Sequence, residues 1–261
     1  MFELLMNHMV FGAFLRPIGM FVMFPVLGSK NLGSSLIRNG LIIAFTIPII
    51  PFFLHAPVVQ SRALASEWLG FDILLQELVI GAVLGFAVSM AFWALDSAGF
   101  IIDTIRGSSM GTVLNPSLGE PTSVMGILFV QLFITLFFMH GGLNNILQIL
   151  YSSYAIIPPG AEITFGSNWT TLIVAIWHPM FSLCLSFVLP AVIVMVLTDL
   201  AVGLINRTAQ QLNVFFIAMP LKSVMAIFML AISMFFSFEV YFKHIDQLPE
   251  TINSLLQGII Q

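Results

Sequence analysis

Charged side chains are scarce in this sequence, and their scarcity argues against most classes of soluble protein. They make up 8% of the 261 residues, whereas soluble domains average about 25%. No charge occurs in the 41 residues between Glu120 and Glu162, or in the 36 residues between Glu162 and Asp199. Each gap is longer than the roughly 20 apolar residues that a helix needs to cross a bilayer. We therefore expect an integral membrane protein with several membrane-embedded helices.

The sequence also holds little that would support enzyme chemistry or a disulfide framework. Cys184 is the single cysteine, so we expect neither an intrachain disulfide nor a cysteine zinc site. The five histidines form no HExxH pair, and no GxSxG, P-loop or GxGxxG motif is present. The net charge is −4 and no basic patch stands out, so nucleic acid is not an expected partner. We predict a protein that is not an enzyme and has no catalytic residue, metal site or cofactor.

The apolar pattern predicts an all-α, polytopic membrane protein with kinked and broken helices. Six apolar segments cover roughly residues 9–27, 36–54, 73–95, 124–150, 170–198 and 212–242. Prolines such as Pro17, Pro179 and Pro190 lie inside these segments, and proline within a helix removes a hydrogen bond and bends the axis. No polar stretch is long enough for a soluble domain, so we treat residues 1–261 as one membrane domain.

Four charged residues lie inside or at the edge of apolar segments: Arg16, Glu77, Asp199 and Lys222. A charge at the centre of a bilayer costs about 2.5–3.5 kcal/mol on insertion scales, so such groups usually face protein or water and have a partner. We expect Lys222 to be buried against a carboxylate, with Glu77 and Asp199 as the two candidates.

Glu77 shares a helix face with Gly81 and Gly85, which follow it at i+4 and i+8. The two glycines form a GxxxG pattern, which lets a second helix backbone approach closely. Two interpretations are open. The face is either an ion or substrate relay, or a helix-packing face that contains one buried ion pair, and the second is favoured.

A polar interlude, residues 96–123, separates two apolar segments and reads DSAGFIIDTIRGSSMGTVLNPSLGEPTS. If the preceding helix continues into it, Asp103 and Arg106 are i, i+3 neighbours that can pair. After Arg106 the many glycines and prolines disfavour a helix. The interlude is either a solvated surface loop or a loop folded back into a pore or cleft, because irregular backbone at membrane depth must be buried in protein or line water.

Two blocks of the sequence resemble the T subunit of the type III secretion export apparatus, the SctT group, which is related to FliR of the flagellar export gate. The first block combines Glu77, a Gly-rich helix, FWA, an acidic residue, AG and I-D-x-x-R-G, followed by N-P-x-x-G and T-S. The second block is LINRTAQQLNVFFIAMPLKS, and the pair covers about residues 67–225. Thr104-Ile105 and Gln210 depart from the usual Asn-Gln and Pro. FliR usually lacks the I-D-x-x-R-G motif, and the presence of this motif here favours the secretion branch.

This resemblance implies a subunit of a helical export gate in the bacterial inner membrane, part of which projects toward the periplasm. Its implied partners are R-type (FliP-like) and S-type (FliQ-like) subunits, a U-type (FlhB-like) switch subunit, the needle or rod base, membrane lipid and unfolded proteins in transit. The family's plug loop matches residues here that we expect to line or close the pore: Arg106, Gly107, Ser108, Ser109, Met110, Gly111, Asn115, Pro116 and Gly119.

Two rival functions remain to be compared with this one. A flagellar export-gate subunit of the FliR type would have the same fold and many of the same motifs. A small-solute secondary transporter would have inverted repeats with paired broken helices and ion ligands at the bilayer midplane, and the sequence shows no such pairing.

Overall fold

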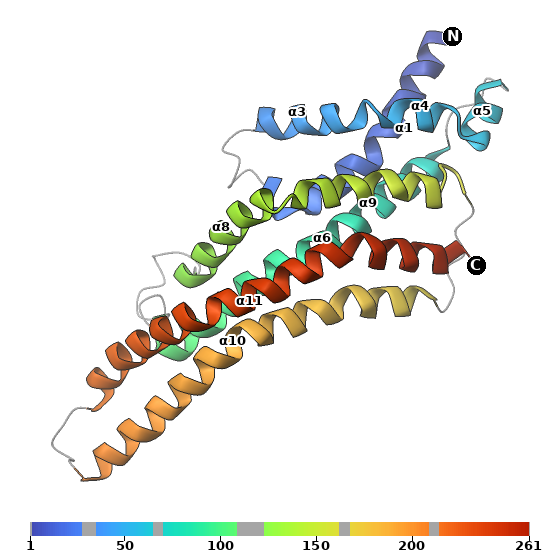
Figure 1. Ribbon diagram of the computed structural model, residues 1–261. Coiled ribbons are helices and arrows are strands. Elements are labelled where there is room, and N and C mark those ends of the chain that lie inside the picture. Colours follow the sequence, from blue (N-terminus) through green and yellow to red (C-terminus); the bar gives the residue numbers. More distant parts are fainter. Residues whose placement is uncertain are drawn as a thin grey trace. The chain divides into compact units, whose positions relative to one another are not determined.

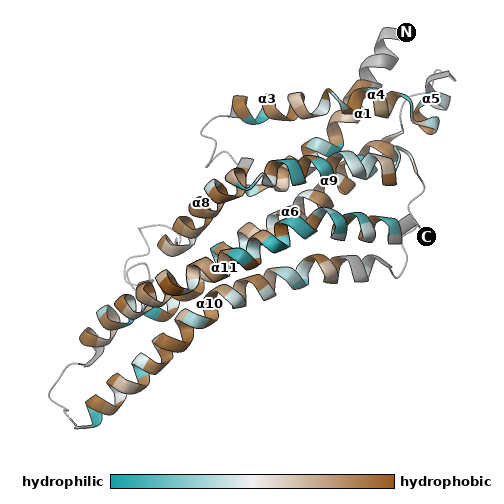
Figure 2. Cartoon of the chain, in the orientation of Figure 1, coloured by the Kyte–Doolittle hydropathy of each residue, from teal (hydrophilic) through white to brown (hydrophobic). Residues whose placement is uncertain are grey.

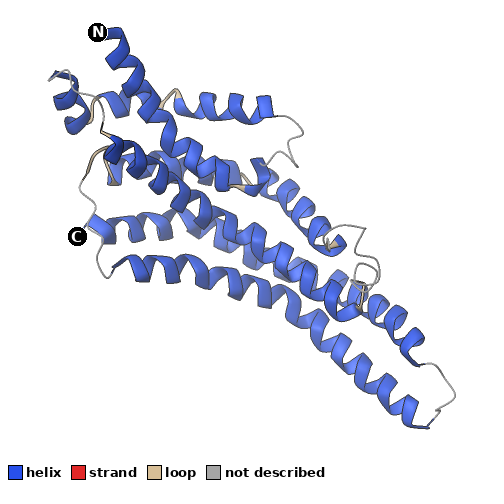
Figure 3. Cartoon of the chain, turned by 180° about the vertical axis from the view of Figure 1, so that it is seen from behind, coloured by secondary structure: helices blue, strands red, loops and turns tan. Residues whose placement is uncertain are grey.

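The protein is helical throughout the residues that its computed structural model describes, which are 2–27, 35–64, 70–108, 123–161, 168–208 and 214–260. Within these ranges there is no β-strand (Figure 1 and Figure 3), so the all-α prediction is confirmed. The N-terminal elements are α1 (Phe2–Met23), the 3-10 turn η1 (Pro25–Leu27), α3 (Ser35–Thr46), α4 (Ile49–Leu54) and α5 (Pro57–Leu64). The later helices are α6 (Phe71–Arg106), α8 (Val124–Met139), α9 (Gly142–Ile156), α10 (Asn168–Thr208) and α11 (Val214–Ile260).

Three of the described helices, α6, α10 and α11, are long and apolar enough to cross a membrane. The bent pair α8 and α9 would add a fourth span if it crosses as one unit. The six apolar segments predicted from the sequence therefore do not correspond to six long membrane-spanning helices among the described residues. The apolar parts of α1 and α3, Val10–Met23 and Leu36–Thr46, are shorter than a bilayer requires.

The sharpest break lies between α8 and α9, and glycine rather than proline produces it. The two helices meet at 74°. Gly141 has φ +79°, a left-handed conformation that only glycine adopts without strain and that commonly ends a helix. In contrast, α10 continues through Pro179 and Pro190 as one helix. The predicted broken helix is present, but the residue responsible for this break is different from those we expected.

Helix α11 extends well beyond the predicted segment 212–242 and ends at Ile260. Figure 2 shows more hydrophilic colouring along its C-terminal part, where charged residues such as Glu239 and Glu250 occur. Apolar residues on the other face of that part are buried, among them Ile245, Leu248 and Ile252. The predicted apolar segment ended at residue 242 because the part of α11 that follows is amphipathic and is not uniformly apolar.

The chain packs into two compact units that draw on the same long helices. The first contains residues 1–90, 138–177 and 245–261, and the second contains residues 91–137 and 178–244. In the first unit α1 packs against α3 and α4. Helices α6, α10 and α11 each continue from one unit into the other, so we retain a single domain over residues 1–261 as a prediction.

Aromatic side chains form the centre of the second unit. Phe133 of α8 contacts Phe92 of α6 edge to face, with ring centroids 5.0 Å apart. Phe187 of α10 makes a similar contact with Phe129 at 4.8 Å, and Tyr241 of α11 lies 5.4 Å from Phe133. Edge-to-face pairs contribute about 0.5–1.5 kcal/mol beyond the burial of their area. The aromatic cluster therefore holds segments of four helices together.

Candidate functional site

The predicted pore loop is described by the structure only at its base. Arg106 is the last residue of α6, and Gly107 and Ser108 form the turn that follows it. The other residues expected in the loop lie outside the described residues: Ser109, Met110, Gly111, Asn115, Pro116 and Gly119. The contacts at the two ends of residues 109–122 are therefore the part of this candidate site that the structure defines.

Helix α6 continues through the first part of the polar interlude and ends in a glycine cap. Gly107 has φ +85°. Its N–H donates to the carbonyl of Thr104 (3.1 Å), and the N–H of Ser108 donates to the carbonyl of Asp103 (3.1 Å). This is the hydrogen-bond pattern of a Schellman motif. The glycine that the sequence placed after Arg106 therefore defines where the helix ends.

Asp103, in the last turn of α6, connects that helix to the start of α8. Its Oδ2 accepts hydrogen bonds from the Ser123 hydroxyl (2.9 Å) and the Met125 N–H (3.1 Å). Its side chain is almost completely buried. We call Asp103, Ser123 and Met125 the Asp103 clasp. It joins the two described ends of the chain on either side of residues 109–122.

Arg106 pairs with Asp103 on the other side of the carboxylate. Its Nη2 lies 2.8 Å from Asp103 Oδ1, and both side chains are largely buried. The contact is an ion pair without hydrogen-bond geometry, and Arg106 Nε has no hydrogen-bond partner among the described residues. The i, i+3 spacing in the sequence thus brings these two charges together at the base of the loop.

Lys222 links α11 to both α10 and the end of α6. Its Nζ lies 2.6 Å from Asp199 Oδ1 and donates to the carbonyl of Ile105 at 3.5 Å. Asp199 and Lys222 lie on either side of the connection from α10 to α11. Glu77, the other carboxylate expected to pair with Lys222, is instead bonded to Arg16, so that alternative is wrong.

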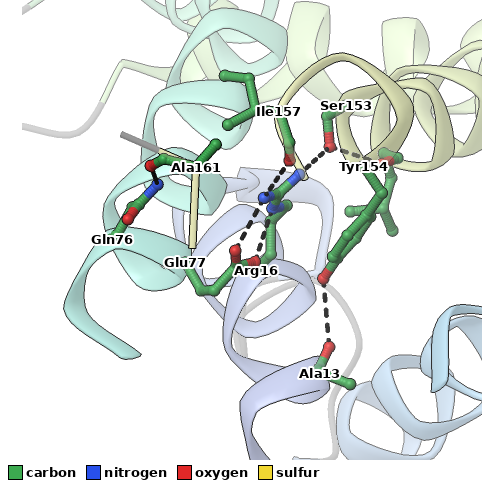
Figure 4. Close-up of polar contacts among 9 residues, drawn as sticks. Ala13, Arg16, Gln76, Glu77, Ser153, Tyr154, Ile157 and Ala161 are labelled. Atoms are coloured by element: carbon green, nitrogen blue, oxygen red, sulfur yellow. Dashed lines mark hydrogen bonds and ion pairs between the residues drawn. The ribbon is translucent and has the colours of Figure 1, made fainter. Parts of the chain in front are cut away.

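A second polar group, which we call the Arg16 cluster, lies in the first compact unit and is formed by Arg16, Glu77, Ser153, Tyr154 and Ile157 (Figure 4). Arg16 of α1 binds Glu77 of α6 through two hydrogen bonds of 2.9 Å, from Nε and from Nη2. Both side chains are 0% exposed. A planar guanidinium matches a carboxylate in this two-bond geometry, which a lysine ammonium cannot reproduce.

The remaining donors of Arg16 reach the end of α9. Its Nη1 donates to the Ser153 hydroxyl (3.1 Å) and its Nη2 to the carbonyl of Ile157 (3.0 Å). The guanidinium carbon lies 3.9 Å from the centre of the Tyr154 ring, within the range of a cation–π contact. Tyr154 in turn donates to the carbonyl of Ala13 at 3.3 Å. The cluster thus ties three helices together inside one unit.

Close contact between α1 and α6 depends on glycine at the positions beside Glu77. A Cβ added at Gly81 would overlap the backbone carbonyl of Arg16, and one added at Gly85 would overlap that of Met20. On α1, a Cβ at Gly19 would lie 2.5 Å from the carbonyl oxygen of Leu78. The face that carries Glu77, Gly81 and Gly85 therefore lies directly against the backbone of α1.

Sequence reasoning missed the partner of Arg16 and the role of Ser123. Arg16 and Glu77 were both recognised as charges in apolar segments, and arginine is the cation best suited to a buried two-bond pair with a carboxylate. That preference is a signal that would have favoured this pairing over one between Glu77 and Lys222. Among the described residues, no group of three His, Cys, Asp or Glu side chains is placed to hold a metal ion.

Comparisons with known proteins agree on one family. Residues 8–248 match the family described as bacterial export proteins, family 1. The chain is 43% identical to secretion system apparatus protein SsaT of Salmonella typhimurium, over 90% of each chain. It is 34% identical to Yop proteins translocation protein T of Yersinia pestis, over 83% of this chain and 82% of that protein. Identity to flagellar biosynthetic protein FliR of Escherichia coli is 28%, over 86% of this chain and 83% of FliR. The chain therefore belongs to the bacterial export proteins of family 1.

Proposed function

We propose that this chain is a core export-gate subunit of a type III protein secretion system. The observation that carries the proposal is the order of similarity: 43% and 34% identity to two secretion apparatus proteins, against 28% to flagellar FliR. The alignments cover similar shares of the chain, so the difference is not an effect of alignment length.

In this role the chain forms a pore with R-type (FliP-like) and S-type (FliQ-like) subunits in the bacterial inner membrane. Unfolded proteins pass through this pore toward the needle or rod, and the U-type (FlhB-like) switch subunit binds the same assembly. The wide apolar faces of the described helices support assembly with other subunits and lipid. On α10 and α11 alone, exposed side chains include Phe181, Leu189, Ile193, Phe228 and Phe235. The chain moves its cargo without chemistry of its own.

Within that gate we propose that the loop beginning at Arg106 and ending before Ser123 lines or closes the export path. The support is the location of its base, where the buried Asp103 clasp and the Arg106 pair hold both ends. We expect that deletion of residues 108–112 leaves assembly intact and makes the gate leaky. The measurement is the permeability of cells to small solutes when they produce the complex. A deletion variant that assembles normally and leaks no more than wild type would show that the segment is only a surface loop.

Gene replacement in the bacterium that produces the chain tests the function as a whole. Deleting its gene should abolish secretion of the needle and effector proteins while swimming motility stays normal, and the wild-type gene should restore secretion. Affinity purification of the tagged chain in mild detergent should recover the R- and S-type subunits. Loss of motility with secretion intact would assign the chain to the flagellar gate instead.

A further inference from the structure

Proline lies inside two helices of the first compact unit, at Pro17 of α1 and at Pro249 in the C-terminal part of α11. A proline has no N–H, so the carbonyl four residues before it loses the donor that a helix normally provides. The two carbonyls concerned belong to Ala13 and Ile245. These residues are 0% and 3% exposed, and a buried carbonyl without a donor costs free energy. Each carbonyl therefore needs a donor from elsewhere in the protein.

Helix α9 provides the donor for the carbonyl of Ala13. The hydroxyl of Tyr154 donates to it at 3.3 Å (Figure 4). Tyr154 is itself buried, and its ring is held against the guanidinium of Arg16. The hydroxyl thus supplies a hydrogen bond at the position where Pro17 cannot supply one.

The same helix provides the donor for the carbonyl of Ile245. The side-chain amide of Asn145 donates to this carbonyl at 3.3 Å and to Oδ1 of Asp246 at 3.4 Å. Further along, the hydroxyl of Ser152 donates to Oδ1 of Asn253 at 2.8 Å. The pairs 145–246 and 152–253 are both separated by 101 positions, so α9 and this part of α11 run parallel with one constant offset. That offset places Asn145 beside the carbonyl affected by Pro249.

We propose that α9 is a common clamp for the two proline positions of the first compact unit. The Tyr154 hydroxyl replaces the hydrogen bond that is lost at Pro17. The Asn145 amide replaces the one that is lost at Pro249. Both α1 and the C-terminal part of α11 therefore depend on α9 for the stability of their backbones at these positions, and displacement of α9 would release both together. This role is independent of which export system the chain serves.

A double-mutant cycle on the purified chain in detergent tests the clamp on α1. Tyr154→Phe keeps the ring and leaves the Ala13 carbonyl without this donor, so the equilibrium constant for unfolding should rise about tenfold or more. In Pro17→Ala the new backbone N–H can bond the same carbonyl. The change Tyr154→Phe should then raise the constant by less than about threefold. A hydroxyl that merely packs against α1 would cost the same in both backgrounds.

A second cycle tests the clamp on α11. Asn145→Leu should raise the equilibrium constant for unfolding more in the wild-type chain than in Pro249→Ala, by a factor of about three or more. The N–H restored at position 249 replaces only the bond to the Ile245 carbonyl, whereas the bond to Asp246 is lost in both backgrounds.

The matched control is Tyr151→Phe, which removes another hydroxyl from α9. Tyr151 donates to the carbonyl of Phe45 at 3.4 Å, and the residue four positions after Phe45 is Ile49, which has an N–H. Tyr151→Phe should therefore have the same effect with and without Pro17.

The two cycles can each overturn the proposal. Equal effects of Tyr154→Phe with and without Pro17 would remove the clamp on α1, and equal effects of Asn145→Leu with and without Pro249 would remove the clamp on α11. Either result ends the claim that α9 serves both helices. Coupling of Tyr151→Phe to Pro17 as strong as that of Tyr154→Phe would show that the effect is not specific to the freed carbonyl. If an alanine variant does not fold, Pro17→Gly or Pro249→Gly, which also restores the N–H, takes its place in the same cycle.

Discussion

The buried pair of Arg16 and Glu77 gives the sharpest test of how charge stabilises this fold. Both side chains are 0% exposed, and Glu77 makes its two hydrogen bonds to Arg16 alone among the described residues. The informative perturbations are Glu77→Leu, Arg16→Met and the double replacement. Each apolar residue approximates the volume of the side chain it replaces, so differences between the variants report mainly on charge.

The expected magnitudes follow from which group each variant leaves without a partner. Glu77→Leu leaves the guanidinium buried without its counter-charge, which costs about 3–5 kcal/mol of unfolding free energy. Arg16→Met leaves the carboxylate in the same situation and also leaves the Ile157 carbonyl without this donor. The double variant removes both charges and retains only the cost of that carbonyl, about 1–3 kcal/mol. The double variant should therefore be more stable than either single variant.

The assay is equilibrium unfolding of the purified chain in detergent, analysed as a double-mutant cycle. We expect a coupling energy of at least about 3 kcal/mol between the two sites. Glu239→Leu, at an exposed acid on α11, is the control and should change stability by no more than about 0.5 kcal/mol. If the two single losses simply add in the double variant, the charges do not stabilise each other and the reasoning is refuted.

Two further predictions concern a close helix contact and an ion pair between helices. Any Cβ at position 81 meets the backbone carbonyl of Arg16. Gly81→Ala should therefore lower the free energy of unfolding by about 1–3 kcal/mol. Gly81→Leu should reduce the amount of assembled complex on a native gel. Gly203→Ala, where nothing lies within 4 Å of an added Cβ, should be neutral or stabilising by up to about 1 kcal/mol; equal losses at both glycines would contradict this account of the crossing. Lys222→Met should lower the free energy of unfolding by about 1 kcal/mol or less, because its partner Asp199 is 44% exposed to solvent. Measured by thermal unfolding, the double variant Lys222→Met/Asp199→Leu should lose less stability than the sum of the two single losses. Strict additivity would argue that the pair is not coupled.

The sequence was sufficient to predict the helical class, the place of most apolar helices and the family. Uncharged gaps such as that between Glu162 and Asp199 reflect a direct cost of charge in lipid, which any local window detects. The extension of α11 to Ile260 was missed, because its last part buries one face and exposes the other. Hydropathy averages over both faces, whereas periodicity would have separated them.

Some contacts of the candidate sites could be predicted from local sequence spacing, whereas others join residues that are far apart in the sequence. The Asp103–Arg106 contact follows from helical spacing alone and could be written down from the sequence. The bonds from Arg16 to Ser153 and Ile157 join residues 137 and 141 positions apart, and no local pattern encodes such a distance. The break at Gly141 was also hidden, because a glycine pair is a weaker signal than proline until the backbone conformation is known.

The residue numbers of the Arg16 cluster also determine when its contacts can first form during synthesis of the chain. Arg16 emerges from the ribosome 61 residues before Glu77 and 141 residues before Ile157. At about 5–20 residues per second, synthesis of those 141 residues takes about 7–28 s. For about the first 3–12 s of that time, until Glu77 is made, α1 carries an arginine whose carboxylate partner does not yet exist. Docking of α1 against α6 can therefore begin once Glu77 has been made, whereas the contacts with Ser153 and Ile157 can form only after residue 157 has been made.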